Sequence, residues 1–156
     1  MAIERVREYL KKKGFDARVR EFDVSSATVE LAAMALGCEG ARIAKSLSFM
    51  LNGEAIIIVT AGDAKVDNAK YKAKFATKAK MLTPDEVISL IGHAVGGVCP
   101  FAINEGVKVY LDVSMKRFST VFPACGSSSS AIELTIPELE ELSDYTEWID
   151  VCKNWE

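Results

Sequence analysis

Two segments of the chain combine residue types that could bind or activate a substrate. The first is Arg42-Ile43-Ala44-Lys45-Ser46-Leu47, in which Lys45 stands among apolar residues at the start of a predicted strand. A buried lysine is costly because its charge loses hydration unless a partner replaces the water. Lys45 is therefore either a functional cation or a strand-edge lysine whose ammonium extends to solvent, and the local pattern leaves both interpretations open.

The second segment runs from Gly92 to Phe101 and contains three glycines and Pro100. Neighbouring glycines allow backbone N–H groups to approach a ligand closely and to bind an anion. The same glycines also suit a tight turn, so the segment predicts either an anion-binding loop or a purely structural one.

A cysteine and a histidine offer a different kind of chemistry. Cys99 follows the single histidine, His93, by six residues, and such a pair could form a thiol nucleophile with its base. That spacing does not guarantee contact, and no acid is evident to orient the imidazole. The four cysteines are scattered without a C-x-x-C pair, so we expect reduced thiols and no metal site.

Charge is distributed unevenly along the chain, although the net charge is only −3. The segment from Glu133 to Glu156 has eight acids and a single lysine, Lys153. The overall balance argues against a general nucleic-acid-binding protein. The segment between Asp67 and Asp85 has no acid, and its lysines suit either a solvated helix face or contact with phosphates. These five lysines are Lys70, Lys72, Lys74, Lys78 and Lys80.

Length and composition predict one globular domain over residues 1–156. The chain is 49% apolar and 26% charged, which is typical of a domain with its own hydrophobic core. No stretch approaches the ~20 apolar residues of a membrane span, and the N-terminus lacks the apolar run of a signal peptide. We therefore expect a cytoplasmic protein with no membrane partner.

The order of predicted elements indicates an α+β fold. Asn52-Gly53 predicts a type I′ hairpin, and Thr83–Glu86 forms a capping box at a helix start. Helices are predicted over 2–13, 28–36, 66–75 and 83–92, and from Pro137. Strands are predicted over 19–24, 43–51, 54–61, 107–113, 120–124 and 131–136. Strands outnumber helices and follow one another closely, which favours a mixed, partly closed sheet or barrel with helices packed outside.

Taken together, these segments resemble the YbaK/ProX family of aminoacyl-tRNA editing domains. The family pattern is R-I-x-K-[ST]-L, then a strand ending A-G-D, then G-G-[VI]-x-P-[FL], and finally a strand and loop of the type P-A-x-G. This chain has the four motifs in that order, at Arg42–Leu47, Ala61–Asp63, Gly96–Phe101 and Phe122–Gly126. The resemblance extends from about Val24 to Leu142.

The resemblance implies a free-standing hydrolase that deacylates mischarged tRNA without a metal or cofactor. Its partners would be the acceptor end of an aminoacyl-tRNA and prolyl-tRNA synthetase, and not DNA. The catalytic residues would be Lys45, Gly96, Gly97 and Pro100. The substrate-binding residues would be Thr28, Ser46, Val98, Phe122, Ala124 and Gly126. The tRNA would contact Lys70, Lys72, Lys74 and Lys78.

One departure from the family bears on the substrate. Some relatives carry a histidine near the stretch that corresponds to Phe122–Gly126, and this chain has none there. We therefore expect Cys-tRNA(Pro) rather than an alanyl substrate, because a cysteine thiol titrates near pH 8.5 and can act as its own nucleophile. The alternative is a catalytically silent module that binds tRNA or a synthetase. The presence of both Lys45 and the glycine loop favours the enzyme.

Overall fold

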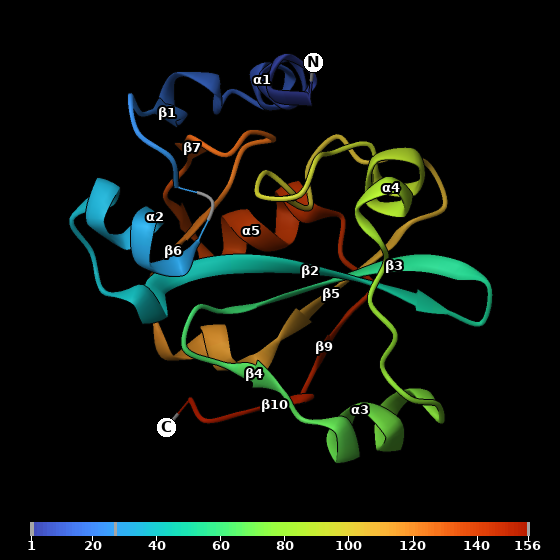
Figure 1. The fold of residues 1–156 in the computed structure, drawn as a ribbon. Helices are drawn as coiled ribbons and strands as arrows, with labels where there is room; N and C mark the ends of the chain where they lie inside the picture. The colour runs from blue at the N-terminus through green and yellow to red at the C-terminus, as the bar shows by residue number, and fades with distance from the viewer. Residues whose placement is uncertain (1, 27, 156) are drawn as a thin grey trace.

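The computed structural model describes residues 2–26 and 28–155, so Glu156 of the acidic segment lies outside it. A curled six-stranded sheet forms its centre (Figure 1). In spatial order its strands are β8 (Leu134–Thr135), β6 (Thr120–Pro123), β2 (Ile43–Leu51), β3 (Glu54–Ala61), β5 (Lys108–Asp112) and β9 (Glu147–Ile149). The sheet is mixed, and the α+β prediction is confirmed.

Helices lie on both sides of the β2–β3 hairpin. The helices are α1 (Ala2–Lys12), α2 (Val29–Leu36), α3 (Asn68–Phe75), α4 (Pro84–Glu86) and α5 (Ile136–Ser143). In Figure 1, α1, α4 and α5 lie above the hairpin and α3 lies below it. None of the helices among the described residues is long and apolar enough to cross a membrane.

The β2–β3 hairpin is built as its sequence predicts. Asn52 and Gly53 both have positive φ, 52° and 84°, as a type I′ turn requires. The two strands then pair without interruption from Leu51 opposite Glu54 to Ala44 opposite Ala61. Strand β3 is buried on both sides and pairs with the parallel strand β5, which explains its continuous apolar sequence.

Short strands account for most differences from the predicted elements. The expected strand 19–24 is reduced to β1 (Arg20–Glu21), and the expected strand 131–136 is divided between β8 and β7 (Ser130–Ala131), which pairs with β1. The expected start of α3 at residue 66 lies in β4 (Lys65–Val66), which pairs with β10 (Cys152–Lys153). Such two-residue strands depend on a distant partner and leave almost no periodic pattern in the sequence.

The helix predicted from residue 83 to residue 92 changes type along its length. The capping box between Thr83 and Glu86 is present, and Gly92 ends the helix with a φ of 98°. Between them, the segment Val87–Ile91 forms a π-helical turn instead of continuing α4. The chain then enters the glycine-rich segment without regular structure.

A buried carboxylate fixes the far end of β3. Asp112 accepts hydrogen bonds from the backbone N–H groups of Ser114 and Val151, both at 3.0 Å. The Ser114 hydroxyl in turn accepts the N–H of Ala61 at 3.1 Å. These bonds satisfy buried polar groups where β5 and β3 end, and they hold the segment before β10 against them.

A close approach of two glycines joins the end of β3 to the turn that precedes β2. The Gly62 N–H donates to the carbonyl of Ala41 at 3.3 Å. A Cβ at Gly62 would lie 2.0 Å from the Gly40 carbonyl oxygen and 2.9 Å from a methyl group of Val29. No larger residue fits there unless the backbone of the turn at Gly40 moves away from Gly62.

We expect Gly62→Ala to lower the free energy of unfolding by about 3 kcal/mol or more, because overpacking against backbone cannot relax by side-chain motion. Urea denaturation measures the loss. Gly14→Ala is the matched control. Gly14 has a φ of +83°, and nothing lies within 4 Å of a Cβ added there, so we expect the free energy of unfolding to fall by only about 1–2 kcal/mol. Equal losses in the two variants would contradict this account of Gly62.

Candidate functional site

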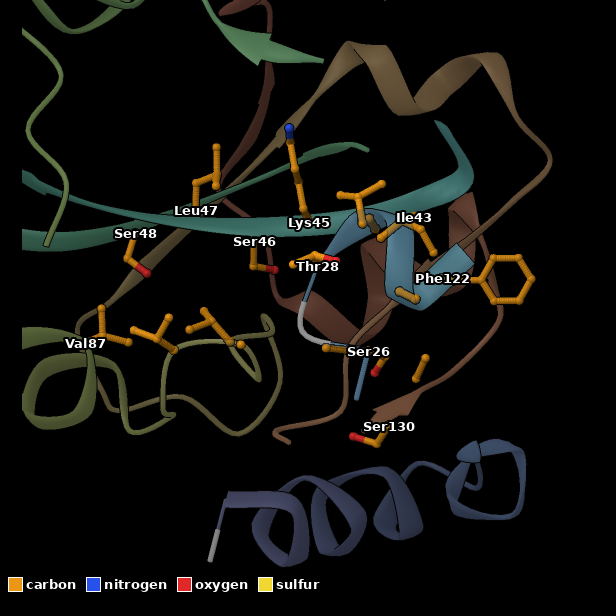
Figure 2. Close-up of a pocket in the computed structure, with 18 of the residues that line it drawn as sticks. Ser26, Thr28, Ile43, Lys45, Ser46, Leu47, Ser48, Val87, Phe122 and Ser130 are labelled. Atoms are coloured by element: carbon orange, nitrogen blue, oxygen red, sulfur yellow. The ribbon is translucent and has the colours of Figure 1, made fainter. Parts of the chain in front are cut away.

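A cavity of about 450 Å³ lies beside β2 (Figure 2). Its walls come from α2, β2, the start of α4, the glycine-rich segment, β6 and β7. Most of the lining is apolar, and a few hydroxyl groups interrupt it. This size and this mixture of surfaces are typical of a site for a small organic group.

The cavity exists because the outer edge of β2 lacks a neighbouring strand along its middle. Strand β6 pairs with β2 only at Ile43 and Ala44. Beyond the gap, Phe49 bridges to Met81, and the N–H of Leu82 donates to the carbonyl of Ser48 at 3.1 Å. Among the described residues, no strand pairs with the outer edge between Ala44 and Ser48.

The register of the hairpin determines which backbone groups face this gap. Because a two-residue turn makes Leu51 and Glu54 a hydrogen-bonded pair, the odd-numbered residues of β2 bond to β3. The even-numbered residues direct their N–H and C=O groups outward, as the Met50 N–H does when it donates to the Lys80 carbonyl. The backbone N–H and C=O of Ser46 consequently face the cavity.

The Ser46 side chain adds a polar group to the same wall. Its hydroxyl oxygen is buried and has no hydrogen-bond partner within the described chain. Figure 2 shows Ser46 and Ser48 pointing to the same side of β2, the side on which Val87 lies. A buried hydroxyl without a partner costs about 1–3 kcal/mol, which a bound ligand with a suitable group would recover.

Lys45 does not point where Ser46 points. Side chains alternate along a strand, and Figure 2 shows Lys45 and Leu47 on the side of β2 opposite to Ser46 and Ser48. The Lys45 ammonium is half-buried and lies 3.5 Å from the carbonyl of Gly62. Burial lowers the pKa of this ammonium below its ordinary value, and the nearby Cys152 and Asp63 partly oppose that effect. Lys45 lines the cavity, but its charge lies across the strand from the glycine loop.

The glycine-rich loop contributes Gly96 and Val98 to the cavity lining. Gly96 has a positive φ of 94°, a conformation that favours glycine, and Gly97 does not. Gly97 is required for another reason: a Cβ there would lie 2.7 Å from the backbone nitrogen of Ser127. Its N–H closes a turn onto the Ala94 carbonyl at 3.0 Å, so this group is not a free oxyanion donor.

The structure brings together most of the residues that the sequence assigned to substrate binding. Thr28 caps α2, with its side chain accepting the Leu31 N–H, and also lines the cavity. Arg42 lies over the Phe122 ring at 5.0 Å and pairs with Glu133 at 3.2 Å, which holds β6 against β2. The predicted residues on the cavity wall are Thr28, Lys45, Ser46, Gly96, Val98, Phe122 and Ala124.

Three predicted site residues lie outside the lining, and several lining residues were missed. Gly97, Pro100 and Gly126 shape the loops behind the wall and do not form it. Five of the missed residues are Ser26, Ser48, Met81, Val95 and Ser130. The two-residue repeat of a strand would have placed Ser48 beside Ser46, whereas the other four depend on tertiary contacts.

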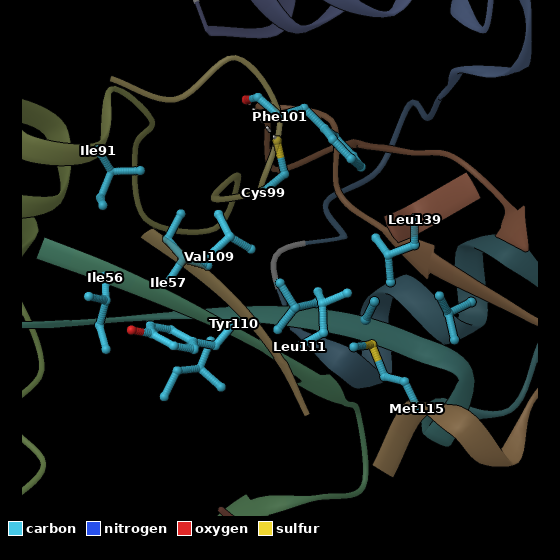
Figure 3. Packing of buried hydrophobic residues seen from close by; sticks show 14 of the residues in the cluster. Ile56, Ile57, Ile91, Cys99, Phe101, Val109, Tyr110, Leu111, Met115 and Leu139 are labelled. Atoms are coloured by element: carbon cyan, nitrogen blue, oxygen red, sulfur yellow. Dashed lines mark hydrogen bonds between the residues drawn. The ribbon is translucent and has the colours of Figure 1, made fainter. Parts of the chain in front are cut away.

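His93 and Cys99 do meet, but in the core. Cys99 Sγ lies 3.6 Å from His93 Nε2, which in turn donates to the Phe101 carbonyl at 2.8 Å. The two residues are 0% and 1% exposed, and neither lines the cavity. Figure 3 shows Cys99 beside Phe101 among buried apolar side chains.

The surroundings of this pair suppress its reactivity. Burial raises the pKa of the Cys99 thiol to about 12 and lowers the pKa of His93. The thiol therefore stays protonated, and the hypothesis of a Cys99 nucleophile is not supported. Within the described part of the chain, no three His, Cys, Asp or Glu residues gather as a metal site would require.

The predicted lysine patch divides into two groups. Lys70 pairs with Asp150 at 3.1 Å and also donates to the Cys152 carbonyl, and Lys74 pairs with Glu147. The acidic C-terminal segment thus neutralises two of the four lysines. Lys72 and Lys78 are exposed and line a second hollow together with Asn68, Ala69 and Ala79.

Comparison with known proteins places this geometry in a family. The model of the aminoacyl-tRNA editing domain family matches residues 23–142. The chain is 55% identical, over the full length of both proteins, to the uncharacterized protein YwhH of Bacillus subtilis (strain 168). It is 33% identical over 104 residues to the proline–tRNA ligase of Halalkalibacterium halodurans, a match that spans 66% of this chain and 18% of the ligase.

Solved structures agree with this assignment. A protein provisionally described as a trans-editing enzyme for prolyl-tRNA synthetase superposes with a TM-score of 0.87 at 30% identity, over 97% of each chain. The hypothetical protein APE2540 superposes with a TM-score of 0.84 at 26% identity, over 96% of this chain and 99% of that one. The motifs around the cavity lie within the matched region, and the chain belongs to the aminoacyl-tRNA editing domain family.

Proposed function

We propose that this protein acts in trans, in the cytoplasm, as a deacylase that removes the amino acid from a mischarged aminoacyl-tRNA. In this proposal residues 1–156 work as a single editing domain, and the aminoacyl end of the substrate occupies the cavity beside β2. Family membership and the match to part of a proline–tRNA ligase support the editing role. The likeness to a protein provisionally described as a trans-editing enzyme for prolyl-tRNA synthetase supports action in trans.

The open edge of β2 suits recognition of an aminoacyl ester. We assign the outward N–H of Ser46 to the ester carbonyl oxygen, where negative charge develops during the reaction. The Ser46 carbonyl and hydroxyl then suit the α-ammonium group of the amino acid. The apolar walls from α2 and β6 exclude water around these polar contacts, which strengthens them.

Lys45 suits the phosphate of the terminal nucleotide better than the reacting carbonyl. Its ammonium lies across β2 from the glycine loop, so it cannot share a ligand atom with that loop without a large movement. A lysine provides a compact point charge, which is the form of contact that a phosphate accepts from any direction. In this arrangement Lys45 positions the substrate, and the groups of the open edge stabilise the transition state.

One observation favours a substrate that brings its own nucleophile. Among the cavity-lining residues that the structure describes, Lys45 is the only one with a titratable side chain. Activation of water by a general base needs such a group within hydrogen-bond distance of the water, and no carboxylate or imidazole is provided. A cysteinyl ester needs no such base, because its own thiol is partly ionised near neutral pH.

The cysteinyl reaction balances without any further reactant. The substrate sulfur loses its proton and bonds to the ester carbonyl carbon, and the bond from that carbon to the ribose O3′ breaks. The ribose oxygen takes up a proton, and a four-membered thiolactone leaves the site, where water later opens it to cysteine. The protein contributes orientation and an oxyanion contact, and both are forms of catalysis by a preorganised site.

The proposed mechanism predicts which charged tRNA reacts fastest. We expect Cys-tRNA(Pro) to be deacylated at least 100-fold faster than Ser-tRNA(Pro) and Ala-tRNA(Pro), because the hydroxyl ionises far less than the thiol and alanine has no nucleophile. Rates with the three charged tRNAs, together with mass spectrometry of the earliest product, make the test. Equal rates, or free amino acid as the first product, would mean that the protein activates water. No reaction with any charged tRNA would favour a silent binding module.

A substitution of Lys45 tests whether its ammonium contacts the substrate. We expect Lys45→Ala to lower kcat/KM for deacylation at least ten-fold, since one lost charged contact is worth about 1.4 kcal/mol or more. The unfolding transition should be unchanged, because a half-buried ammonium contributes little to the folded state. Lys65→Ala is the control, as it removes an exposed charge that lies near Lys45. Near-wild-type activity of Lys45→Ala would remove this residue from the site.

Alkylation of the cysteines separates this mechanism from catalysis by a thiol of the protein. In the native protein, iodoacetamide should modify the partly exposed Cys38 first, whereas the three buried cysteines should react only after unfolding. Deacylation should survive the native labelling, and Cys99→Ser should retain activity. Peptide mapping identifies the labelled residue. Activity that falls in step with labelling of Cys99 would restore the nucleophile hypothesis.

A further inference from the structure

A short segment links the cavity to the second hollow on the protein surface. That hollow, of about 420 Å³, is lined by Lys72 and Lys78 and by Ala79, and Met81 already belongs to the cavity wall. Two residue steps of extended chain span only about 7 Å. Hydrogen bonds hold the segment on the outer edge of β2, from Met50 to the Lys80 carbonyl at 2.8 Å and from Leu82 to the Ser48 carbonyl. The two depressions are therefore neighbours along one edge.

The lysines of this region differ in whether an acid neutralises them. Lys70 and Lys74 pair with Asp150 and Glu147. The other three lysines are exposed, and no acid among the described residues lies within salt-bridge distance of them. These three are Lys72, Lys78 and Lys80. In a protein with a net charge of −3, they form a local positive surface beside the cavity.

Helix α3, which carries Lys72, lies on the same side of β2 as the Lys45 ammonium. The Phe49 ring packs against Tyr71 of α3, with ring centroids 5.4 Å apart. Lys45 projects to the same face of β2 as Phe49, because the two are four residues apart on an alternating strand. That separation is about 13 Å along the strand. A strand of phosphates crossing this face could contact both α3 and Lys45.

We propose that Lys72, Lys78 and Lys80 bind the phosphodiester backbone of the single-stranded 3′ end of tRNA and guide its last nucleotide into the cavity. This inference rests on the proposed function and assigns the route by which the substrate enters. Lysine point charges spaced along an edge suit a flexible chain of phosphates and require no base sequence. At the cavity mouth, Met81 and Val95 are 58% and 63% exposed and offer apolar surface to the terminal bases.

Two double variants test the proposal with matched charge. Lys72→Gln/Lys78→Gln removes two unpaired lysines, and Lys70→Gln/Lys74→Gln removes two paired lysines from the same segment. Binding of an uncharged acceptor-stem minihelix with a single-stranded 3′ CCA end is measured by fluorescence anisotropy at several NaCl concentrations. We expect the first variant to lose ten-fold or more in affinity and to reduce the slope of log K against log salt by about 1.4–1.8. The control should keep the wild-type slope, and Lys72→Arg/Lys78→Arg should restore binding.

The outcomes also separate this proposal from the proposed function. If the wild-type protein deacylates tRNA but Lys72→Gln/Lys78→Gln keeps its affinity for the minihelix and its salt slope, the assignment of these lysines to tRNA binding is wrong. The proposed function is then unaffected. If the salt slope falls as expected but no charged tRNA is deacylated, tRNA binding by these lysines is supported and the proposed deacylase function is contradicted. Equal losses in both double variants would indicate a general charge effect and overturn the proposal. Weaker binding of prolyl-tRNA synthetase with unchanged RNA binding would also overturn it.

Discussion

The unpaired middle of the β2 edge is the constraint on which the rest of the site depends. A strand edge exposes backbone donors and acceptors, and proteins usually cover or blunt such an edge. Here the pairing of β6 with β2 ends at Ala44, opposite Pro123. On the other edge of β6, the Pro123 carbonyl accepts the N–H of Ile132, and Ala124 bridges to Ala131. The opening that results is a cavity with backbone groups on one wall.

Several contacts keep this opening from closing or widening. The stacking of Arg42 on Phe122 fixes β6 where it begins to diverge, and the approach of Gly62 to Gly40 holds the turn before β2 against the end of β3. On the opposite wall, Gly97 brings the loop directly against Ser127. Each contact joins segments far apart in the chain. The motifs that characterise the family therefore position the cavity at least as much as they line it.

The sequence predicts the features that depend on neighbouring residues. It does not predict features that depend on a contact with a residue far away in the chain. The Asn52-Gly53 turn and the capping box at Thr83 depend on neighbouring residues, and both are found as predicted. The neutralisation of Lys70 by Asp150 joins residues 80 positions apart, and no local pattern reports it. The orientation of Lys45 is an intermediate case: strand alternation implies that it opposes Ser46, but the motif alone suggests that both face one ligand.

The central claim is that the aminoacyl end of the substrate binds in the cavity beside β2, and a stable analogue tests it most directly. Cysteinyl-3′-amino-adenosine replaces the labile ester with an amide and can be titrated into isotope-labelled protein while backbone amide signals are recorded by NMR. Our account predicts saturable shifts centred on Ser46, Gly96 and Val98, with little change at Cys99. Saturable shifts confined to other surfaces, with the Ser46 amide unmoved, would contradict it.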